Sequence, residues 1–259
     1  MSSFNFLVNN MRTLVDAFAT LGLADHKGDA TFSPEMFCLM ADSNVSIHSA
    51  IGLQLWPPFF DHYFCRDLKN SWFFFSEIFP LAQYLKDFGY TSFSFSIGRD
   101  PHHAQIEFQG PTRLLLEVTL RLVFCHLPLR IHQFDLSVFV SMDSQQFSNL
   151  ISQYHMFDDV HVTITSERVI FSYSTMQETI LSPQNGQCII GGLRAPDEVE
   201  FVITLGPQEV FNHIASQTKR VWFFKQCNSN RGLITAPLGL NARLVAFFCD
   251  VFANYRRSK

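Results

Sequence analysis

Apolar residues recur at helical spacing in four segments of the chain. The first segment follows Asn9-Asn10 and the third follows Asp143 or Ser144, all residue types that cap helices. The second begins at Pro80 and the fourth at Gly206-Pro207, because proline is tolerated in a first turn. We expect these helices to bury Met11, Leu14, Val15, Phe18 and Leu21, then Leu81, Tyr84, Leu85 and Phe88, then Phe147, Leu150, Ile151 and Tyr154, and finally Val210, Phe211 and Ile214.

Between these helices, apolar and polar residues alternate with a period of two, which predicts β-strands. Turn signals such as Gly98-Arg99-Asp100-Pro101 separate the alternating segments. Each half of the chain therefore has the order helix, strands, helix, strands, which predicts an α+β unit with two helices on one face. The expected strands include Ser92–Ser96, Ala104–Phe108, Leu114–Leu122, Leu136–Val140, Val160–Ile164, Val169–Tyr173, Glu198–Ile203, Val221–Lys225 and Leu244–Phe248.

The two halves also share one layout at a nearly fixed offset. Leu14, Phe18 and Leu21 correspond to Phe147, Ile151 and Tyr154, each 133 positions later. Helix and strand patterns can recur by chance in any α+β protein, but here both order and spacing are kept in separate blocks. An offset of half the chain length predicts two copies of one unit rather than a solenoid of short repeats.

The chain of 259 residues is long enough for two domains, and its 47% apolar content can fill a core in each. We predict a first domain at 1–122, a connector at 123–134 and a second domain at 135–259. The connector has neither the glycine nor the serine of a flexible linker, which favours an extended segment lying along the surface.

Composition and motifs exclude several classes of function. The net charge of −4 gives no general attraction to nucleic acid, so any DNA binding must come from local patches. The six scattered cysteines, the lack of a signal-like amino terminus and the lack of an 18-residue apolar run lead us to expect a reduced, soluble intracellular protein. We find no phosphate loop or nucleophile elbow, and adjacent His102 and His103 would point apart, so we expect no enzyme activity, cofactor or metal site.

The order and length of the elements resemble the eukaryotic sliding DNA clamps, namely the proliferating cell nuclear antigen and the subunits of the DNA-damage checkpoint clamp. Ala41-Asp42-Ser43 is similar to a Met-Asp-Ser turn of that family, and Phe60–Asp67 is similar to its Phe-Asp-x-Tyr-x-Cys-Asp-Arg stretch. Leu116–Met142 matches the end of the first clamp domain, the connector and the start of the second in hydrophobicity. Ser49–Tyr63 is closer to a checkpoint subunit, so the choice between replicative and checkpoint clamp stays open.

This resemblance implies two tandem clamp domains, with sheets outside and helices facing a central hole through which duplex DNA passes. Basic side chains on such helices contact phosphates without reading sequence. The residues expected to face DNA are Arg12, Lys86, Gln145, Asn149, His213, Lys219 and Arg220, the last two taken as part of the fourth helix. The wall departs from the family because it is mostly Asn, Gln and Ser, which leaves open weak DNA contact, charge supplied by partner subunits, or loss of DNA tracking.

The resemblance further implies other clamp subunits in a homotrimer or heterotrimer, a clamp-loader ATPase, client proteins with clamp-binding peptides, and a nuclear location. Ring assembly would pair Leu114–Leu122 of one subunit with Thr175–Leu181 of the next, since unpaired strand edges otherwise invite aggregation. A protein-only interaction scaffold on the same fold is the alternative function. Client peptides would dock in an apolar groove lined by Met40, Val45, Leu127, Leu129 and Ile131, although these residues could instead pack the connector.

Overall fold

The computed structural model describes residues 3–42, 49–110, 115–124, 134–174, 177–227 and 229–248. The chain forms two compact units. Unit 1 comprises Met1–Ala41, Gly52–Arg130 and Leu238–Arg243, and unit 2 comprises Asp42–Ile51, Ile131–Pro237 and Leu244–Lys259. The domain boundaries expected from the sequence stay a prediction.

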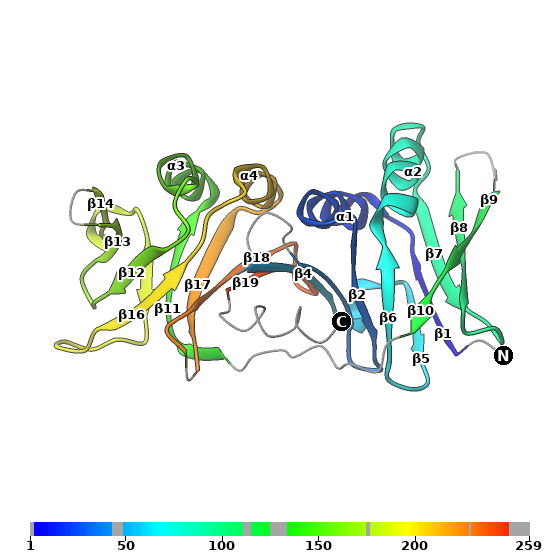
Figure 1. Cartoon of the computed structure of the whole chain (residues 1–259), viewed down its shortest axis with the longest axis horizontal. Helices are drawn as coiled ribbons and strands as arrows, with labels where there is room; N and C mark the ends of the chain where they lie inside the picture. The colour runs from blue at the N-terminus through cyan, green and yellow to red at the C-terminus, as the bar shows by residue number, and fades with distance from the viewer. Residues whose placement is uncertain are drawn as a thin grey trace. The chain divides into compact units, whose positions relative to one another are not determined.

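The first half of the chain supplies two helices and ten strands among the described residues (Figure 1). They are β1 (Phe4–Val8), α1 (Arg12–Ala24), β2 (Lys27–Phe32), β3 (Phe37–Asp42), β4 (Ser49–Leu55), β5 (His62–Cys65), β6 (Lys69–Phe74), α2 (Phe75–Asp87), β7 (Ser92–Ile97), β8 (His103–Gln109), β9 (Leu115–Arg121) and β10 (Val123–Phe124), with a short 3-10 helix, η1 (Pro57–Phe59), after β4.

The second half repeats this order without a counterpart of β10 in its described part. Its elements are β11 (Phe134–Asp143), α3 (Ser144–Tyr154), β12 (Val160–Ile164), β13 (Val169–Tyr173), β14 (Gln177–Leu181), η2 (Pro183–Asn185), β15 (Ile189–Gly191), β16 (Val199–Ile203), α4 (Gln208–Gln217), β17 (Arg220–Gln226), β18 (Gly232–Pro237) and β19 (Ala242–Phe248).

The strand order shows that the two halves are copies of one unit. In the first half the neighbours run β5-β1-β7-β8-β9 and β6-β2-β3-β4, with β10 beside β6. In the second half they run β15-β11-β17-β18-β19 and β16-β12-β13-β14. Advancing each strand label by ten converts one pair of orders into the other. The predicted α+β duplication is therefore confirmed in its topology as well as in its sequence offset.

Alternating Ser and Phe explain why β7 forms a strand with one buried face. Phe93 and Phe95 are at most 1% exposed, whereas the serines between and after them lie on the other face. Phe95 packs on Phe4 and Phe6 of the neighbouring β1, with ring centroids 5.9 and 5.5 Å apart. Each fully buried Phe contributes about 1.5–3 kcal/mol to stability. A phenylalanine cluster thus forms the core of unit 1.

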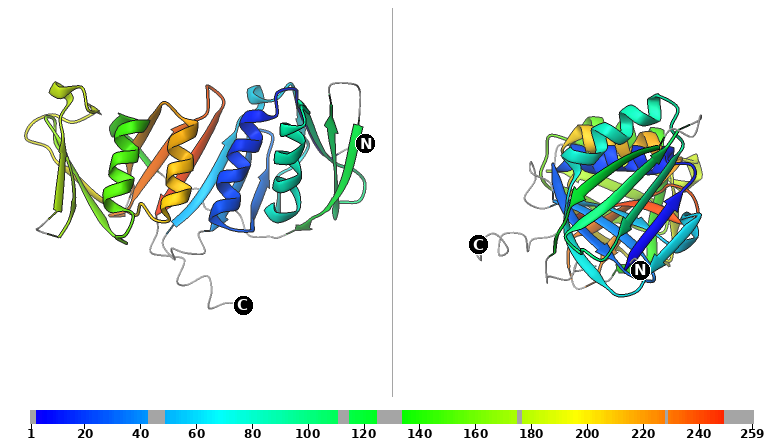
Figure 2. Two further views of the ribbon diagram at one scale, coloured as in Figure 1. Left: turned by 90° about the horizontal axis from the view of Figure 1, so that it is seen from above. Right: turned by 90° about the vertical axis from the view of Figure 1, so that its right-hand side faces the viewer.

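The helices pack in pairs, α1 beside α2 in unit 1 and α3 beside α4 in unit 2 (Figure 2). Every apolar residue expected to be buried by the first, third and fourth helices is at most 1% exposed. Asp143 caps α3 as predicted, since its side chain accepts a hydrogen bond of 2.8 Å from the backbone N–H of Gln146. At the start of α1, Met11 is the N-cap residue and makes no side-chain cap bond, whereas Asn10, one of the two expected caps, accepts a hydrogen bond of 3.3 Å at Oδ1 from the Arg12 backbone N–H.

The prediction for the second helix was wrong about its start and its buried face. The helix α2 begins at Phe75, so Pro80 is its sixth residue rather than part of its first turn. Its buried residues include Ile78, Phe79, Ala82 and Leu85. A helix that begins at Pro80 omits the buried residues Ile78 and Phe79, so the apolar face inferred from Leu81, Tyr84, Leu85 and Phe88 points in a different direction from the real one. As a result Tyr84 and Phe88, expected to be buried, are 57% and 63% exposed.

The fourth helix begins one residue later and ends earlier than the sequence suggested. Pro207 is the N-cap residue rather than the first helical residue, and the helix ends at Gln217. Thr218 is the C-cap, and Arg220 is the first residue of β17. The assignment of Lys219 and Arg220 to this helix was therefore wrong.

Candidate nucleic-acid interface and assembly edges

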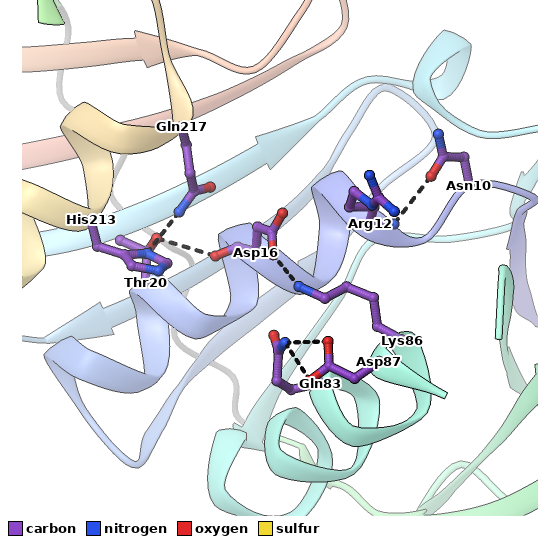
Figure 3. Close-up of polar contacts among 9 residues, drawn as sticks. All are labelled: Asn10, Arg12, Asp16, Thr20, Gln83, Lys86, Asp87, His213 and Gln217. Carbon is purple, nitrogen blue, oxygen red and sulfur yellow. Dashed lines mark hydrogen bonds and ion pairs between the residues drawn. The ribbon is translucent and has the colours of Figure 1, made fainter. Parts of the chain in front are cut away.

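The two helices of unit 1 are joined by an ion pair between their polar side chains. Lys86 of α2 places its Nζ 2.6 Å from Asp16 Oδ1 of α1, and the two side chains are 17% and 37% exposed (Figure 3). Arg12 is exposed at the start of α1, and its backbone N–H donates to Asn10 Oδ1 at 3.3 Å. Lys86 is thus neutralised by its own neighbour, whereas Arg12 presents its charge to solvent.

The helix faces of unit 2 are polar but almost uncharged. On α3, the Gln145 amide donates to Asn149 Oδ1 at 3.4 Å, and no residue of this helix is charged. On α4, the Gln217 amide nitrogen lies 2.8 Å from His213 Nδ1 (Figure 3). These side chains suit hydrogen bonds to phosphate or water, and they supply little positive charge.

The four helices together hold two cations and four carboxylates, a net charge of −2. The cations are Arg12 and Lys86, and the carboxylates are Asp16, Glu77, Asp87 and Glu209. Because attraction to DNA depends on neutralising phosphates with Lys and Arg, these helix sequences give little non-specific affinity by themselves.

Lys219 and Arg220 are held at the end of α4 by different contacts. The carbonyl of Lys219 accepts a hydrogen bond of 3.2 Å from the N–H of Ser144 at the start of α3, and the Lys219 side chain is exposed. Arg220 donates a hydrogen bond from Nη1 to Ser141 Oγ at 3.0 Å. In the ladder between β11 and β17, its backbone lies opposite that of Asp143. Arg220 thus belongs to the sheet next to the helices, and of the two only Lys219 has an exposed side chain.

The predicted client groove is only partly within the described residues. Met40 lies on β3 and is 9% exposed, opposite Asp29, which in turn pairs with Trp72 of β6. The Lys27 ammonium lies 5.6 Å from the Trp72 ring centroid. Val45, Leu127, Leu129 and Ile131 lie outside the described residues, so the groove stays a prediction.

Two edge strands carry exposed apolar residues that the sequence analysis did not single out. Strand β9 ends one sheet order and β14 ends another, and they match the two segments expected to pair during assembly. These exposed residues are Leu115 on β9 and Ile180 on β14, and Tyr173 on β13 is exposed beside β14.

Side-chain hydrogen bonds fasten the β14 edge and the neighbouring β13 to α3. The fully buried Tyr154 donates its hydroxyl to the Phe171 carbonyl at 2.9 Å and lies 3.1 Å from Thr179 Oγ1. Thr179 donates to Gln153 Oε1 at 2.6 Å, and the Gln177 amide donates to the Gln153 carbonyl at 3.2 Å. These contacts hold β14 in place as a firm edge.

A duplicated α+β unit, with paired helices and sheets repeated in the same strand order, is the fold of the sliding DNA clamps. The solved structure of Proliferating Cellular Nuclear Antigen from Entamoeba histolytica is similar to this chain over 96% of its length and 99% of the other chain, with a TM-score of 0.73 and 13% identity. No protein-family model matches the chain, and no curated protein sequence matches it. The expected clamp fold is thereby confirmed, and at this identity the likeness extends to the fold alone.

The described residues lack the features of two other classes of site. None of the described helices is both long and apolar enough to cross a membrane. Within the same residues, no three His, Cys, Asp or Glu side chains gather where they could share a metal ion. Near the turn before β8, His103 Nδ1 lies 2.6 Å from Asp100 Oδ2, and the hydrogen bond from the His102 backbone N–H is the main cause that lowers the pKa of Asp100.

Proposed function

We propose that this protein is a non-enzymatic subunit of a ring-shaped sliding clamp that encircles duplex DNA and tethers polymerase, repair or checkpoint factors in the nucleus. The observation that carries this proposal is the duplicated strand order, which leaves β9 and β14 at the ends of their sheet orders. In this proposal a separate ATPase loads the ring, and client peptides bind beside the connector. Whether the ring serves replication or the damage checkpoint is decided by its partners.

The two edges support assembly because each offers both strand hydrogen bonds and apolar side chains. Leu115 on β9 is 55% exposed and Ile180 on β14 is 50% exposed. Pairing the edges of neighbouring subunits would satisfy the backbone groups and bury these side chains. Such a contact is head-to-tail, and it closes into a ring when the rotation per subunit divides a full turn.

A protein-only scaffold is the second candidate, and the charge of the helices favours it. Their net charge is −2, from two cations and four carboxylates, and one of the cations, Lys86, is paired with Asp16. In a heteromeric ring, basic partner subunits would supply the missing positive charge. The ring proposal is therefore compatible with these weakly charged helices only if DNA contact is weak or is made in part by other subunits.

The native mass of the assembly tests the ring. Size-exclusion chromatography with light scattering, on the chain alone and after co-expression with candidate clamp subunits, should give a trimer in one of the two cases. Ile180→Ser should weaken the assembly about tenfold, because a half-exposed Ile loses about 1–1.5 kcal/mol of burial. Leu68→Ser is the matched control, since Leu68 is 62% exposed in the turn between β5 and β6. A strict monomer in both cases, or equal effects of the two variants, would refute the ring.

Retention on circular DNA separates the two candidates. The assembled ring is loaded onto nicked plasmid, washed in salt and released by linearising the plasmid. A ring that encircles DNA leaves the linear form and stays on the circular form. A protein-only scaffold shows the same low retention on both.

A further inference from the structure

Arg243 is oriented by two contacts within unit 1. Its Nε donates a hydrogen bond of 2.7 Å to Gln54 Oε1, and its guanidinium carbon lies 4.9 Å from the Trp56 ring centroid. A guanidinium has five N–H donors in a rigid plane, so the hydrogen bond to Gln54 uses one of them. Stacking and hydrogen bonding together hold the remaining donors in a fixed direction, which is the arrangement that recognises carboxylates in a bidentate manner.

The charge of Arg243 has no anionic partner among the residues that the structure describes. Its side chain is half-buried, and burial lowers the pKa of Arg243. The ionisable neighbour that offsets this is the Cys38 thiol, whose own pKa burial raises to about 12, so it stays neutral at pH 7. A partly desolvated cation without a counter-charge gains stability when a carboxylate approaches it.

Backbone hydrogen bonds fix the turn that precedes Arg243 and connect it to Trp56. The Trp56 backbone N–H donates to the Asn241 carbonyl at 3.0 Å, and the Leu238 N–H donates to the Ala242 carbonyl at 2.9 Å. These bonds hold the turn between β18 and β19, where Gly239 adopts a φ of +114°. The turn presents Leu240, which is 99% exposed.

Trp56, Pro58, Leu240 and Arg243 form what we call the Trp56–Arg243 surface, and all four belong to unit 1. Pro58 is exposed in η1, directly after Trp56 and Pro57. Tryptophan and arginine are enriched among the residues that dominate binding energy at protein interfaces. The surface therefore combines an oriented cation with an apolar anchor on backbone that is already hydrogen-bonded.

We propose that the Trp56–Arg243 surface binds an acidic peptide segment of a partner protein, in which a carboxylate meets the Arg243 guanidinium and a neighbouring apolar side chain packs on Leu240 and Trp56. Charge complementarity argues for a carboxylate, and the apolar part argues for a peptide, because a peptide can place an aliphatic side chain next to its carboxylate whereas a phosphodiester backbone has none. This interaction goes beyond the clamp assignment and does not depend on ring assembly.

Binding of synthetic peptides to the full chain tests the proposal. The probes are 12-residue peptides in which Leu lies one to four positions from Glu, with matched peptides that carry Gln in place of Glu. The chain has three tryptophans, so the Trp56 indole signal can be assigned in a ¹H–¹⁵N spectrum with Trp56→Phe. We expect the Glu peptides to shift this signal saturably and the Gln peptides to bind roughly tenfold more weakly, since hydrogen bonds between charged groups are the strong ones.

Variants then assign the binding to the two parts of the surface. Arg243→Gln should reduce the Glu peptides to the affinity of the Gln peptides, and Arg243→Lys should fall between, because lysine keeps the charge without the planar donors. Leu240→Ser should weaken both peptide sets several-fold, and at 99% exposure this change leaves the fold intact. Arg99→Gln, at an exposed arginine in the turn before β8, is the control and should have no effect.

Four results would overturn the proposal. They are equal affinity for Glu and Gln peptides, no saturable shift with any peptide, no loss of affinity in Leu240→Ser, and displacement of the peptides by duplex DNA at comparable concentration. Self-association of the chain that Leu240→Ser abolishes would assign the surface to a second copy instead.

Discussion

The ion pair between Lys86 and Asp16 makes a sharp prediction about DNA binding by the proposed clamp. With its Nζ 2.6 Å from Asp16 Oδ1, Lys86 is already neutralised and should contribute little to phosphate contact. Asp16→Asn removes the carboxylate while keeping the shape of the side chain. We expect this substitution to release Lys86 for one additional phosphate contact.

The size of the effect follows from counterion release. Each neutralised phosphate of B-DNA adds about 0.9 to the slope of log affinity against log salt. One added contact therefore makes affinity fall about 3.5-fold more between 50 and 200 mM salt than it does in the unmodified chain. Fluorescence anisotropy of a labelled 30-base-pair duplex, titrated at five salt concentrations, measures this slope.

A double-mutant cycle decides whether Lys86 is the cation that is released. Lys86→Gln alone should leave the slope nearly unchanged, and in the Asp16→Asn background it should remove the whole gain. Asp87→Asn is the matched control, because Asp87 accepts hydrogen bonds from Gln83 at 3.2 and 3.3 Å rather than pairing with a cation. A slope that falls by about 0.9 in Lys86→Gln alone would refute the reasoning, since Lys86 would then already contact phosphate.

Three further predictions concern stability, each measured by urea unfolding. Tyr154→Phe should cost about 1–2 kcal/mol, because it removes the buried hydrogen bond to the Phe171 carbonyl and leaves that carbonyl without this donor, whereas Tyr173→Phe, at a half-exposed ring, should be nearly neutral. Gly192→Ala should destabilise by more than 1 kcal/mol, since φ is +85° and a Cβ would lie 1.7 Å from a backbone oxygen, whereas Gly98→Ala has open space and should cost little. Because burial raises the pKa of the Cys38 thiol from 9.0 to about 12, its contribution is full below about pH 9 and is lost toward pH 12, and Cys38→Ala should flatten that alkaline loss.

The parts of the fold that could be predicted from sequence are those that a buried apolar face controls. Strands β12 and β13 were predicted with the residues at which they begin and end, since their alternation is uninterrupted. The helix α3 follows the same rule, because all four of its predicted core residues are 0% exposed. Helix α2 failed because Pro80 looked like a start signal, whereas the preceding residues already continue the helix.

The candidate site was harder to predict because its behaviour depends on contacts between distant residues. Asp16 and Lys86 are 70 positions apart, and sequence alone shows only that each is polar on its own helix. Arg220 was placed on a helix because it follows α4 closely, yet its guanidinium bonds Ser141 of β11, which is 79 positions away. The first contact neutralises a cation on the helices, and the second places a cation on the sheet rather than on a helix.

Ring assembly and DNA contact, the two parts of the proposed function, therefore have unequal physical support. The ring proposal depends on strand order and on the edges β9 and β14, which follow from core-directed periodicity and are repeated at a fixed offset. DNA contact depends instead on a few charged residues that no core constrains, and the sequences of the four helices carry a net charge of −2. A chain can therefore keep the clamp architecture while its helix faces lose basic residues, provided that other subunits of the ring supply them. The slope of DNA binding measured for this chain alone and for its assembly would distinguish shared charge from charge that is absent altogether.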